Sequence, residues 1–316
     1  MLAFIVRRLL LLVPVLMIVG VIVFTLIHLI PGDPAAIMLG REATLEQKEA
    51  LRQRLGLNEP ILSQFVTWFG NALRLNFGES LFMGMPVTEA LRERAEPTGL
   101  LTLYALTLAV LIAIPAGVFA AVRANSPLDR LLMVISIGGV AIPSFFFGIL
   151  LILLFAVVLG WLPSGGYAGI RDDPIQHFKY MLLPSLTLGF SAAGLLARLV
   201  RSTMLDVLND DYVRTAYAKG LRERSVVVLH ALRNALIPVL TVIGIALGGM
   251  LGGAVVIETV FNIPGMGRLL VQSVTRRDFP VVQGAVMTVA AVQVLVMLLV
   301  DVLYVFVDPR IRYGGD

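Results

Sequence analysis

The side chains of this chain that could take part in chemistry are few, and they do not cluster. There is no cysteine, which excludes disulfides, thiol chemistry and cysteine metal sites. The three histidines stand far apart, at His28, His177 and His230. The sequence has no G-x-x-x-x-G-K-[ST] segment, the loop that cradles nucleotide phosphates. We therefore expect no catalytic residue, no cofactor site and no metal site in this chain.

The most unusual segment is short and basic, RTAYAKGLRERSVVVLHALRN at 214–234, between two long apolar runs. Asp210 and Asp211 precede it and are placed to cap a helix over about 212–219, because acidic groups favour the positive end of a helix dipole. Gly220 then supplies a flexible corner. The sequence therefore predicts two short helices that meet at a glycine and form a charged hairpin.

Two interpretations of this hairpin remain open on the residues alone. It is either a solvated loop that only fixes topology, or a rigid docking element that transmits force from a partner protein to the apolar runs it joins. In the second case, the residues at its tip would contact the partner. These residues are Arg214, Thr215, Ala216, Tyr217, Ala218, Lys219, Gly220, Leu221 and Arg222.

The composition identifies the surroundings of the hairpin. The chain is 58% hydrophobic and 15% charged, whereas a soluble domain has about 25% charged residues. A membrane-spanning helix needs about 20 mostly apolar residues. Six segments satisfy this length: 9–30, 99–122, 131–159, 181–199, 235–257 and 281–307. We predict an all-α polytopic membrane protein with six transmembrane helices, whose solvent is the lipid bilayer.

The distribution of Lys and Arg predicts the orientation. With the N-terminus inside, the inner segments hold 13 basic residues. The outer segments hold five when 31–98 is left out, because segments longer than about 60 residues follow the positive-inside rule poorly. Both termini are then cytoplasmic, and the hairpin lies in the most basic inner loop. The net charge of +4 reflects this asymmetry, and no nucleic-acid partner is expected.

The long outer segment 31–98 is expected to be helical. Thr44-Leu-Glu-Gln47 fits a capping box, and Gly56 stands where that helix would stop. A second, amphipathic helix is predicted over about 61–73, and a third from near Thr88 to Pro97. A helical cap over the membrane part and direct substrate contact both remain open for this segment.

The fifth span is unusually rich in glycine. Close helix packing through Gly244–Gly248 and Gly248–Gly252 is one interpretation, because small residues let helices approach in lipid. A pathway lined by small residues is compatible with it. The candidate pathway residues are Gly248, Gly249, Gly252 and Gln293. Asp301, in the last span, is either paired structurally near the inner interface or functional.

The hairpin also resembles a known family. The segment 214–220, followed by HALRNALIP at 230–238, looks like the cytoplasmic loop of the first of two permeases in dipeptide, oligopeptide and glutathione ABC importers. Further segments of that family occur in order along nearly the whole chain: PGDP at 31–34, LGL at 55–57, NFG at 76–78, GWLP at 160–163, FNIPGMGR at 261–268, RDFP at 277–280 and DPRIRY at 308–313.

The match departs from the broader importer motif at three positions of the hairpin. Arg214 and Thr215 stand where that motif has glutamate and its first alanine, and Arg233 stands where it has proline, whereas Ala216 and Gly220 match it. A contact made by that glutamate therefore does not carry over to this chain.

The resemblance implies the fold of a type I ABC importer transmembrane domain. Residues 1–98 would form the first transmembrane helix and an extracytoplasmic helical segment. Residues 99–307 would form the core, with the coupling hairpin at about 200–234, and 308–316 a cytoplasmic tail.

The same resemblance implies a function and partners. This permease subunit would form half of a pathway that opens by alternating access in a bacterial or archaeal cytoplasmic membrane. Its implied partners are a second homologous permease, two ABC ATPases that bind ATP and Mg²⁺, and an extracytoplasmic substrate-binding protein. Di- and oligopeptides or glutathione are the implied substrates, with nickel complexes and oligosaccharides as alternatives.

Two other classes of function are less well supported by the residues. A self-sufficient secondary transporter often has inverted repeats and charges at the membrane midplane, neither of which is clear in this sequence. An intramembrane enzyme needs clustered acids, histidines or an activated serine in its spans, whereas this chain has only isolated polar residues there.

Overall fold

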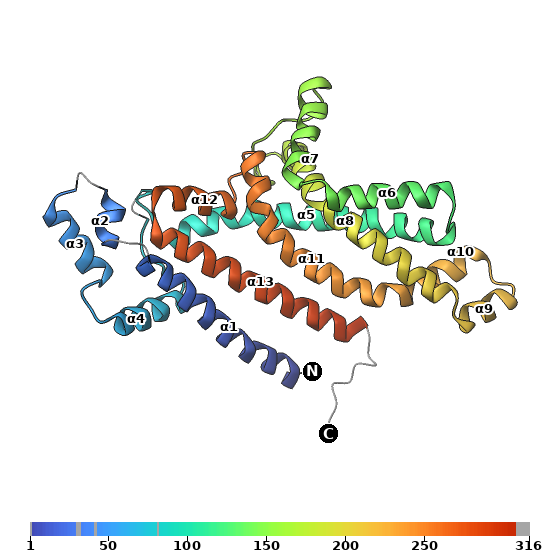
Figure 1. The fold of residues 1–316 in the computed structure, drawn as a ribbon, viewed down its shortest axis with the longest axis horizontal. Coiled ribbons are helices and arrows are strands. Elements are labelled where there is room, and N and C mark those ends of the chain that lie inside the picture. The colour runs from blue at the N-terminus through green and yellow to red at the C-terminus, as the bar shows by residue number, and fades with distance from the viewer. Residues whose placement is uncertain (1, 30–32, 41–42, 81, 308–316) are drawn as a thin grey trace. The chain divides into compact units, whose positions relative to one another are not determined.

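A computed structural model describes residues 2–29, 33–40, 43–80 and 82–307, with the side chains of α1 described from residue 13 (Figure 1). The predicted tail at 308–316 lies outside the described residues. Where the chain is described, all regular elements are helical. They are α1 (Leu2–Leu29), α2 (Pro34–Leu39), α3 (Leu45–Leu55), α4 (Ile61–Leu73), α5 (Val87–Val122), α6 (Pro127–Ala141), α7 (Ser144–Leu151), η1 (Ile152–Val158), α8 (Pro174–Leu208), α9 (Asp211–Ala218), α10 (Glu223–Ser225), η2 (Val226–Leu232), α11 (Arg233–Val260), α12 (Met266–Arg276) and α13 (Phe279–Val307).

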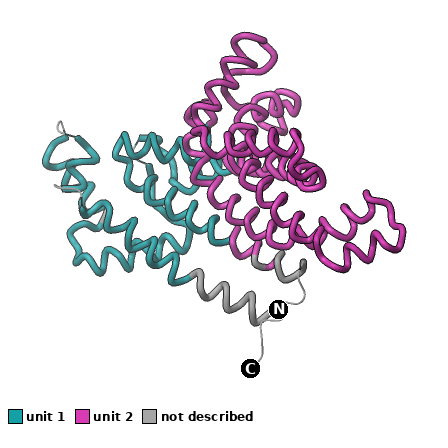
Figure 2. The backbone as a smooth tube through the Cα atoms, turned by 45° about the vertical axis from the view of Figure 1, so that its right-hand side comes forward, with its two compact units in different colours: residues 1–97, 264–295 teal, residues 98–263, 296–316 magenta. Residues whose placement is uncertain are grey.

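The chain forms two compact units, each built from two separate stretches (Figure 2). Among the described residues, those within 1–97 join 264–295, and those within 98–263 join the end of α13 from residue 296. In the first unit, Val87 and Leu91 at the start of α5 pack with Leu269 of α12 and Val281 of α13. This apolar cluster explains why α12 belongs with the N-terminal stretch although it is distant in sequence.

Four helical segments are long and apolar enough to cross a membrane: α5, α8, the continuous helix 223–260 that contains α11, and 279–300 of α13. The bent pair formed by α6 and α7–η1 makes a fifth if it is counted as one span. The part of α1 whose side chains are described, Val13–Leu29, is a shorter apolar helix. The predicted first span, 9–30, begins before this part of the helix. The all-α membrane fold is confirmed.

The predicted third span, 131–159, is bent within its length. α6 ends at Ala141, α7 begins at Ser144, and the two are bent by 109°. Pro143 lies at the break. Its ring disfavours helical backbone at the preceding Ile142, which is extended at φ −82° and ψ 125°.

Helix α5 corrects a predicted boundary. The third outer helix was predicted to end at Pro97, but α5 runs without interruption from Val87 to Val122. A proline removes only one backbone donor, and spanning helices tolerate it when neighbouring groups satisfy the freed carbonyl. The apolar sequence after Pro97 continues the helix, so the outer piece and the second span are one element.

The other two outer helices are confirmed where they were predicted. Thr44 accepts a hydrogen bond from the Gln47 backbone N–H, and the Gln47 side chain accepts one from the Thr44 N–H, so the capping box is present. Gly56 ends α3 in a left-handed conformation at φ 66°. Helix α4 spans Ile61–Leu73.

Asp33 connects two helices of the outer segment, α2 and α3. Its carboxylate caps α2 by accepting from the Ala35 and Ala36 N–H groups and pairs with Arg52 of α3, with 3.1 Å between Nε and Oδ1. Partial burial raises the pKa of Asp33, but the hydrogen bond and charge of Arg52, with the two backbone donors, lower it more. The net pKa lies below its ordinary value, and the carboxylate stays charged at neutral pH.

Helix α8 is the centre of the second unit, because α6, α7 and α11 all pack on it. Two of its glycines permit close backbone approach. A Cβ on Gly194 would lie 2.4 Å from the Ser136 carbonyl oxygen of α6, and one on Gly189 would lie 2.6 Å from that of Ala105 in α5. Any larger residue would push these helices apart, which matters because α8 leads directly into the hairpin.

Candidate functional site

The hairpin is built from α9, α10 and η2, which connect α8 to α11. Helix α9 ends in a Schellman motif: the Gly220 N–H donates to the Tyr217 carbonyl at 2.9 Å, and the Leu221 N–H to that of Ala216 at 3.4 Å. Gly220 has φ 77°, a conformation that is energetically unfavourable for any residue that carries a Cβ. The predicted glycine corner is confirmed.

The base of the hairpin is packed. Val213 and Ala216 of α9 and Val226 of η2 form a buried cluster against Val207 and Leu208 at the end of α8. This cluster fixes α9 relative to α8 and η2. A displacement of α9 would therefore be passed to these helices instead of being absorbed in a loop.

A polar contact adds to this base. The Asn234 Nδ2 at the start of α11 donates to the Tyr212 hydroxyl at 2.7 Å and to the His230 carbonyl at 3.2 Å. The Tyr212 hydroxyl in turn reaches that carbonyl at 3.4 Å. These three residues were not predicted as a group, since 18 to 22 positions separate Tyr212 from its partners.

Two details of the hairpin prediction are wrong. Asp210 is the residue at the N-cap of α9, but its side chain makes no capping hydrogen bond. Ala216 and Ala218 were expected to share the contact surface, yet Ala216 is buried in the base and Ala218 is exposed. Helical periodicity explains the second result, because positions two apart lie on different faces of a helix.

The remaining predicted tip residues are all exposed. Tyr217 and Leu221 are 43% and 41% exposed, so the tip presents apolar as well as basic groups. Arg214 lies 3.8 Å from Asp211, a fully exposed contact that contributes little. The exposed tip residues are Arg214, Thr215, Tyr217, Ala218, Lys219, Gly220, Leu221 and Arg222. An exposed tip on a packed base is the geometry that a docking element needs.

The glycines of α11 divide between two faces. A Cβ on Gly244 would lie 2.3 Å from Val300 Cγ1 of α13, whereas one on Gly249 or Gly252 would meet nothing within 4 Å. Gly248 is buried. Close packing is therefore present at Gly244, and Gly252 does not take part in it among the described residues. Of the candidate pathway residues, only Gly249 and Gly252 lie on an open face.

Two further candidate residues lie in α13. Gln293 is half-buried in the part of α13 that belongs to the first unit. Asp301 lies in helix α13, but its side chain is outside the described part of the chain. The assignments of both residues stay predictions.

An ion pair next to the hairpin was missed. Asp129 at the start of α6 is buried and accepts from Arg201 of α8 at 2.6 and 2.7 Å, and from the Asn125 N–H at 2.8 Å. The pair is bidentate, the geometry that holds a guanidinium and a carboxylate most firmly. It ties α6 to the part of α8 that leads into the hairpin. Its two members are 72 positions apart in the sequence, so no local sequence pattern predicts the pair.

A second buried acid lies near the other end of α11. Glu258 has no exposed surface, and the Thr98 hydroxyl of α5 donates to its Oε1 at 2.5 Å. Buried carboxyl groups are retained only when hydrogen-bonded or paired. This contact fixes α5 to α11 within the second unit.

Comparison with protein families gives two matches. Residues 113–313 match the family described as binding-protein-dependent transport system inner membrane component. Residues 1–83 match the N-terminal part of such membrane components.

Two relatives align over nearly the whole chain. The glutathione transport system permease protein GsiC of Escherichia coli K12 is 46% identical over 313 residues, which are 99% of this chain and 100% of that protein. The probable peptide ABC transporter permease protein y4tP of Sinorhizobium fredii is 44% identical over 310 residues, 98% of this chain and 99% of that protein.

Two solved structures have a similar fold. A chain of the MetNI methionine ABC transporter in an inward-facing conformation aligns with a TM-score of 0.56 at 19% identity, covering 69% of this chain and 96% of that one. A chain of an amino acid ABC transporter aligns with a TM-score of 0.51 at 16% identity, covering 71% of this chain and 95% of that one. At these identities the similarity establishes the fold alone.

Proposed function

Because the chain belongs to the family of binding-protein-dependent transport system inner membrane components, we propose that it is one of two permease subunits of an ATP-driven importer for peptides or glutathione. The substrate class rests on the two relatives, which are named for glutathione and for peptides. Half of the pathway would be formed by this chain and half by a second, homologous permease. The importer would lie in a bacterial or archaeal cytoplasmic membrane with both termini of this chain inside.

The hairpin carries the mechanistic part of the proposal. Its tip is exposed, and its base packs on the end of α8 and is hydrogen-bonded to the start of α11 through Tyr212 and Asn234. Closure of two cytoplasmic ATPases would move the tip, and the rigid base would pass that motion to α8 and α11. Because ATP would bind one of the two states more tightly, its binding would shift the equilibrium of these helices between the outward-open and the inward-open state.

Nucleotide chemistry is assigned to the partners. ATP and Mg²⁺ would bind the ATPase subunits, because this chain lacks a phosphate-binding loop. An extracytoplasmic binding protein would deliver the substrate and set most of the selectivity. The residues of this chain would line the pathway, and its hairpin would receive the motion of the ATPases.

Co-purification tests the proposal directly. The chain would be tagged, extracted from its native membrane in mild detergent, and its associated proteins identified by mass spectrometry. We expect a second permease and one or two ATPases with a phosphate-binding loop. Recovery of this chain alone, under conditions that keep other membrane complexes intact, would favour a self-sufficient transporter instead.

A further inference from the structure

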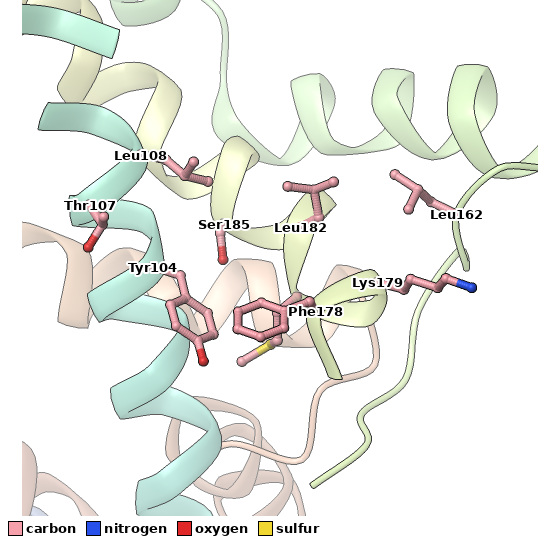
Figure 3. A pocket seen from close by; sticks show the side chains of 9 residues that line it. Tyr104, Thr107, Leu108, Leu162, Phe178, Lys179, Leu182 and Ser185 are labelled. Carbon is pink, nitrogen blue, oxygen red and sulfur yellow. The ribbon is translucent and has the colours of Figure 1, made fainter. Parts of the chain in front are cut away.

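A groove of about 310 Å³ lies between α5 and α8 in the second unit (Figure 3). Its walls are residues 104–108 of α5 and 178–185 of α8, and Leu162 lies at one end. This volume is at the lower end of the range typical of ligand pockets. We refer to it as the α5–α8 groove.

The walls of the groove are apolar, and the few polar groups in them divide into two kinds. The Tyr104 hydroxyl donates to His177 Nε2 at 3.2 Å, since His177 Nδ1 must donate to the Ala168 carbonyl at 2.7 Å. The Thr107 hydroxyl donates to the Leu103 carbonyl at 2.8 Å. Both hydroxyls are therefore used within the protein.

Ser185 differs from them. Its side chain is 1% exposed, and its Oγ has no hydrogen-bond partner among the described residues. Figure 3 shows this hydroxyl directed into the groove, towards the space between the Tyr104 and Phe178 rings. A buried hydroxyl without a partner costs free energy, so a ligand that accepts its hydrogen bond would be favoured at this point.

The groove lies on two helices that are long and apolar enough to span a membrane. Side chains along it are exposed although they are apolar, with Phe178 at 55% and Leu182 at 40%. Such surfaces are stable where lipid is the solvent. Lys179 lies at the groove on α8, immediately before the apolar run 181–199, where lipid headgroups meet a span.

We propose that the α5–α8 groove is a phospholipid-binding site. One acyl chain fills the apolar groove, the Lys179 ammonium pairs with the lipid phosphate, and the Ser185 hydroxyl donates to an ester carbonyl oxygen. Lys179 and Ser185 are six residues apart, which is about 9 Å along the helix axis and about a third of a turn around it. The flexible Lys179 side chain, which extends away from Ser185 in Figure 3, must therefore bend towards the groove for one lipid molecule to reach both residues. A lysine at the end of a spanning helix buries its apolar stem and places its ammonium at the level of the lipid headgroups.

The test uses the full chain, purified with its associated subunits, in nanodiscs of phosphatidylethanolamine and phosphatidylglycerol. The probe is phosphatidylglycerol with a photoreactive diazirine in one acyl chain, and labelled peptides are mapped by mass spectrometry. We expect labelling of peptides that contain 104–108 and 178–185. Lys179→Gln should reduce this labelling about fivefold, whereas Arg171→Gln, in the loop before α8, should leave it unchanged.

A second pair of variants tests the groove itself. Thr107→Trp should block labelling of 178–185, whereas Leu103→Trp, an exposed position one helical turn away that does not line the groove, should preserve it. Both substitutions are on the exposed face of α5, and unchanged elution in size-exclusion chromatography verifies folding.

Two results would overturn the proposal. One is labelling of the wild type that avoids both walls of the groove while other apolar surfaces react, or labelling of the groove that neither Lys179→Gln nor Thr107→Trp reduces below the wild-type level. The other is cross-linking of a photoreactive amino acid at position 107 to another protein chain, which would make the groove a protein interface. Neither result depends on which substrate the importer carries.

Discussion

Gly220 is the residue on which the hairpin geometry depends most. It is the only position of the hairpin, within the described chain, that has a positive φ. Its open surroundings show that space is not the constraint, because a Cβ there would meet nothing within 4 Å. The requirement is conformational: the Schellman motif needs a left-handed residue between Lys219 and Leu221.

We predict that Gly220→Val abolishes ATP-driven uptake while the amount of protein in the membrane is unchanged. A β-branched residue resists φ 77° and would unwind the end of α9, at a cost of about 1–2 kcal/mol or more. Gly220→Asn is the matched control, since asparagine tolerates this conformation and should retain most uptake. Substrate uptake in cells and immunoblots of membranes provide the measurement, and normal uptake by Gly220→Val would contradict a coupling role.

At the scale of elements, the helices that lead to the hairpin are joined to it rigidly. The π-helix η2 continues directly into α11, and the bidentate Asp129–Arg201 pair holds α6 to α8 nearby. Single-turn π segments inside α-helices are frequent at functional sites. The hairpin is therefore connected to three helices: to α8 and α11 through the chain, and to α6 through the ion pair between Asp129 and Arg201 of α8.

The two faces of α11 predict opposite effects of the same substitution. Gly244→Ala puts a methyl group 2.3 Å from Val300 Cγ1 and 2.9 Å from its Cβ, and overpacking of this kind typically lowers stability by about 1–3 kcal/mol. Gly252→Ala meets nothing and should raise the stability of the helix by about 0.5–1 kcal/mol.

Thermal unfolding of the purified variants in one detergent would separate these effects. The two variants change the same atoms in the same helix, so each controls for the other. If Gly252→Ala were the less stable of the two, the division of α11 into a packed and an open face would be wrong. A loss of uptake in a stable Gly252→Ala variant would place the open face in the pathway or against a partner.

At the scale of the whole molecule, the absence of native cysteine makes orientation measurable without background. Leu45, at the start of α3, is 85% exposed, and Leu221 is an exposed residue of the hairpin tip. In cells that lack the ATPases, we predict that Leu45→Cys reacts with a membrane-impermeant maleimide from outside. Leu221→Cys should react only after the membrane is opened.

The reverse pattern would invert the topology and remove the hairpin from the cytoplasm. A further comparison links orientation to coupling. When the ATPases are co-expressed, the labelling of Leu221→Cys in opened membranes should fall, because a docked tip is covered, whereas that of Leu45→Cys should not change.

The sequence by itself determined the features that depend on neighbouring residues. The capping box at 44–47, the stop at Gly56, the helix at 61–73 and the corner at Gly220 follow from hydrogen bonds and dihedral preferences within a few positions. Four of the six predicted spanning segments, and a fifth as a bent pair, follow from length and hydropathy. The order of motifs along the chain was sufficient to identify the family.

Only the tertiary structure decided which residues meet across the fold. The bend at Pro143 lies inside a continuous apolar run, so hydropathy does not reveal it. The pairing of Asp129 with Arg201, the contact of Gly244 with Val300 and the association of α12 with the N-terminal stretch join residues far apart in the chain. Such contacts depend on how whole helices pack, and a one-dimensional pattern carries no information on the distance between two helix faces.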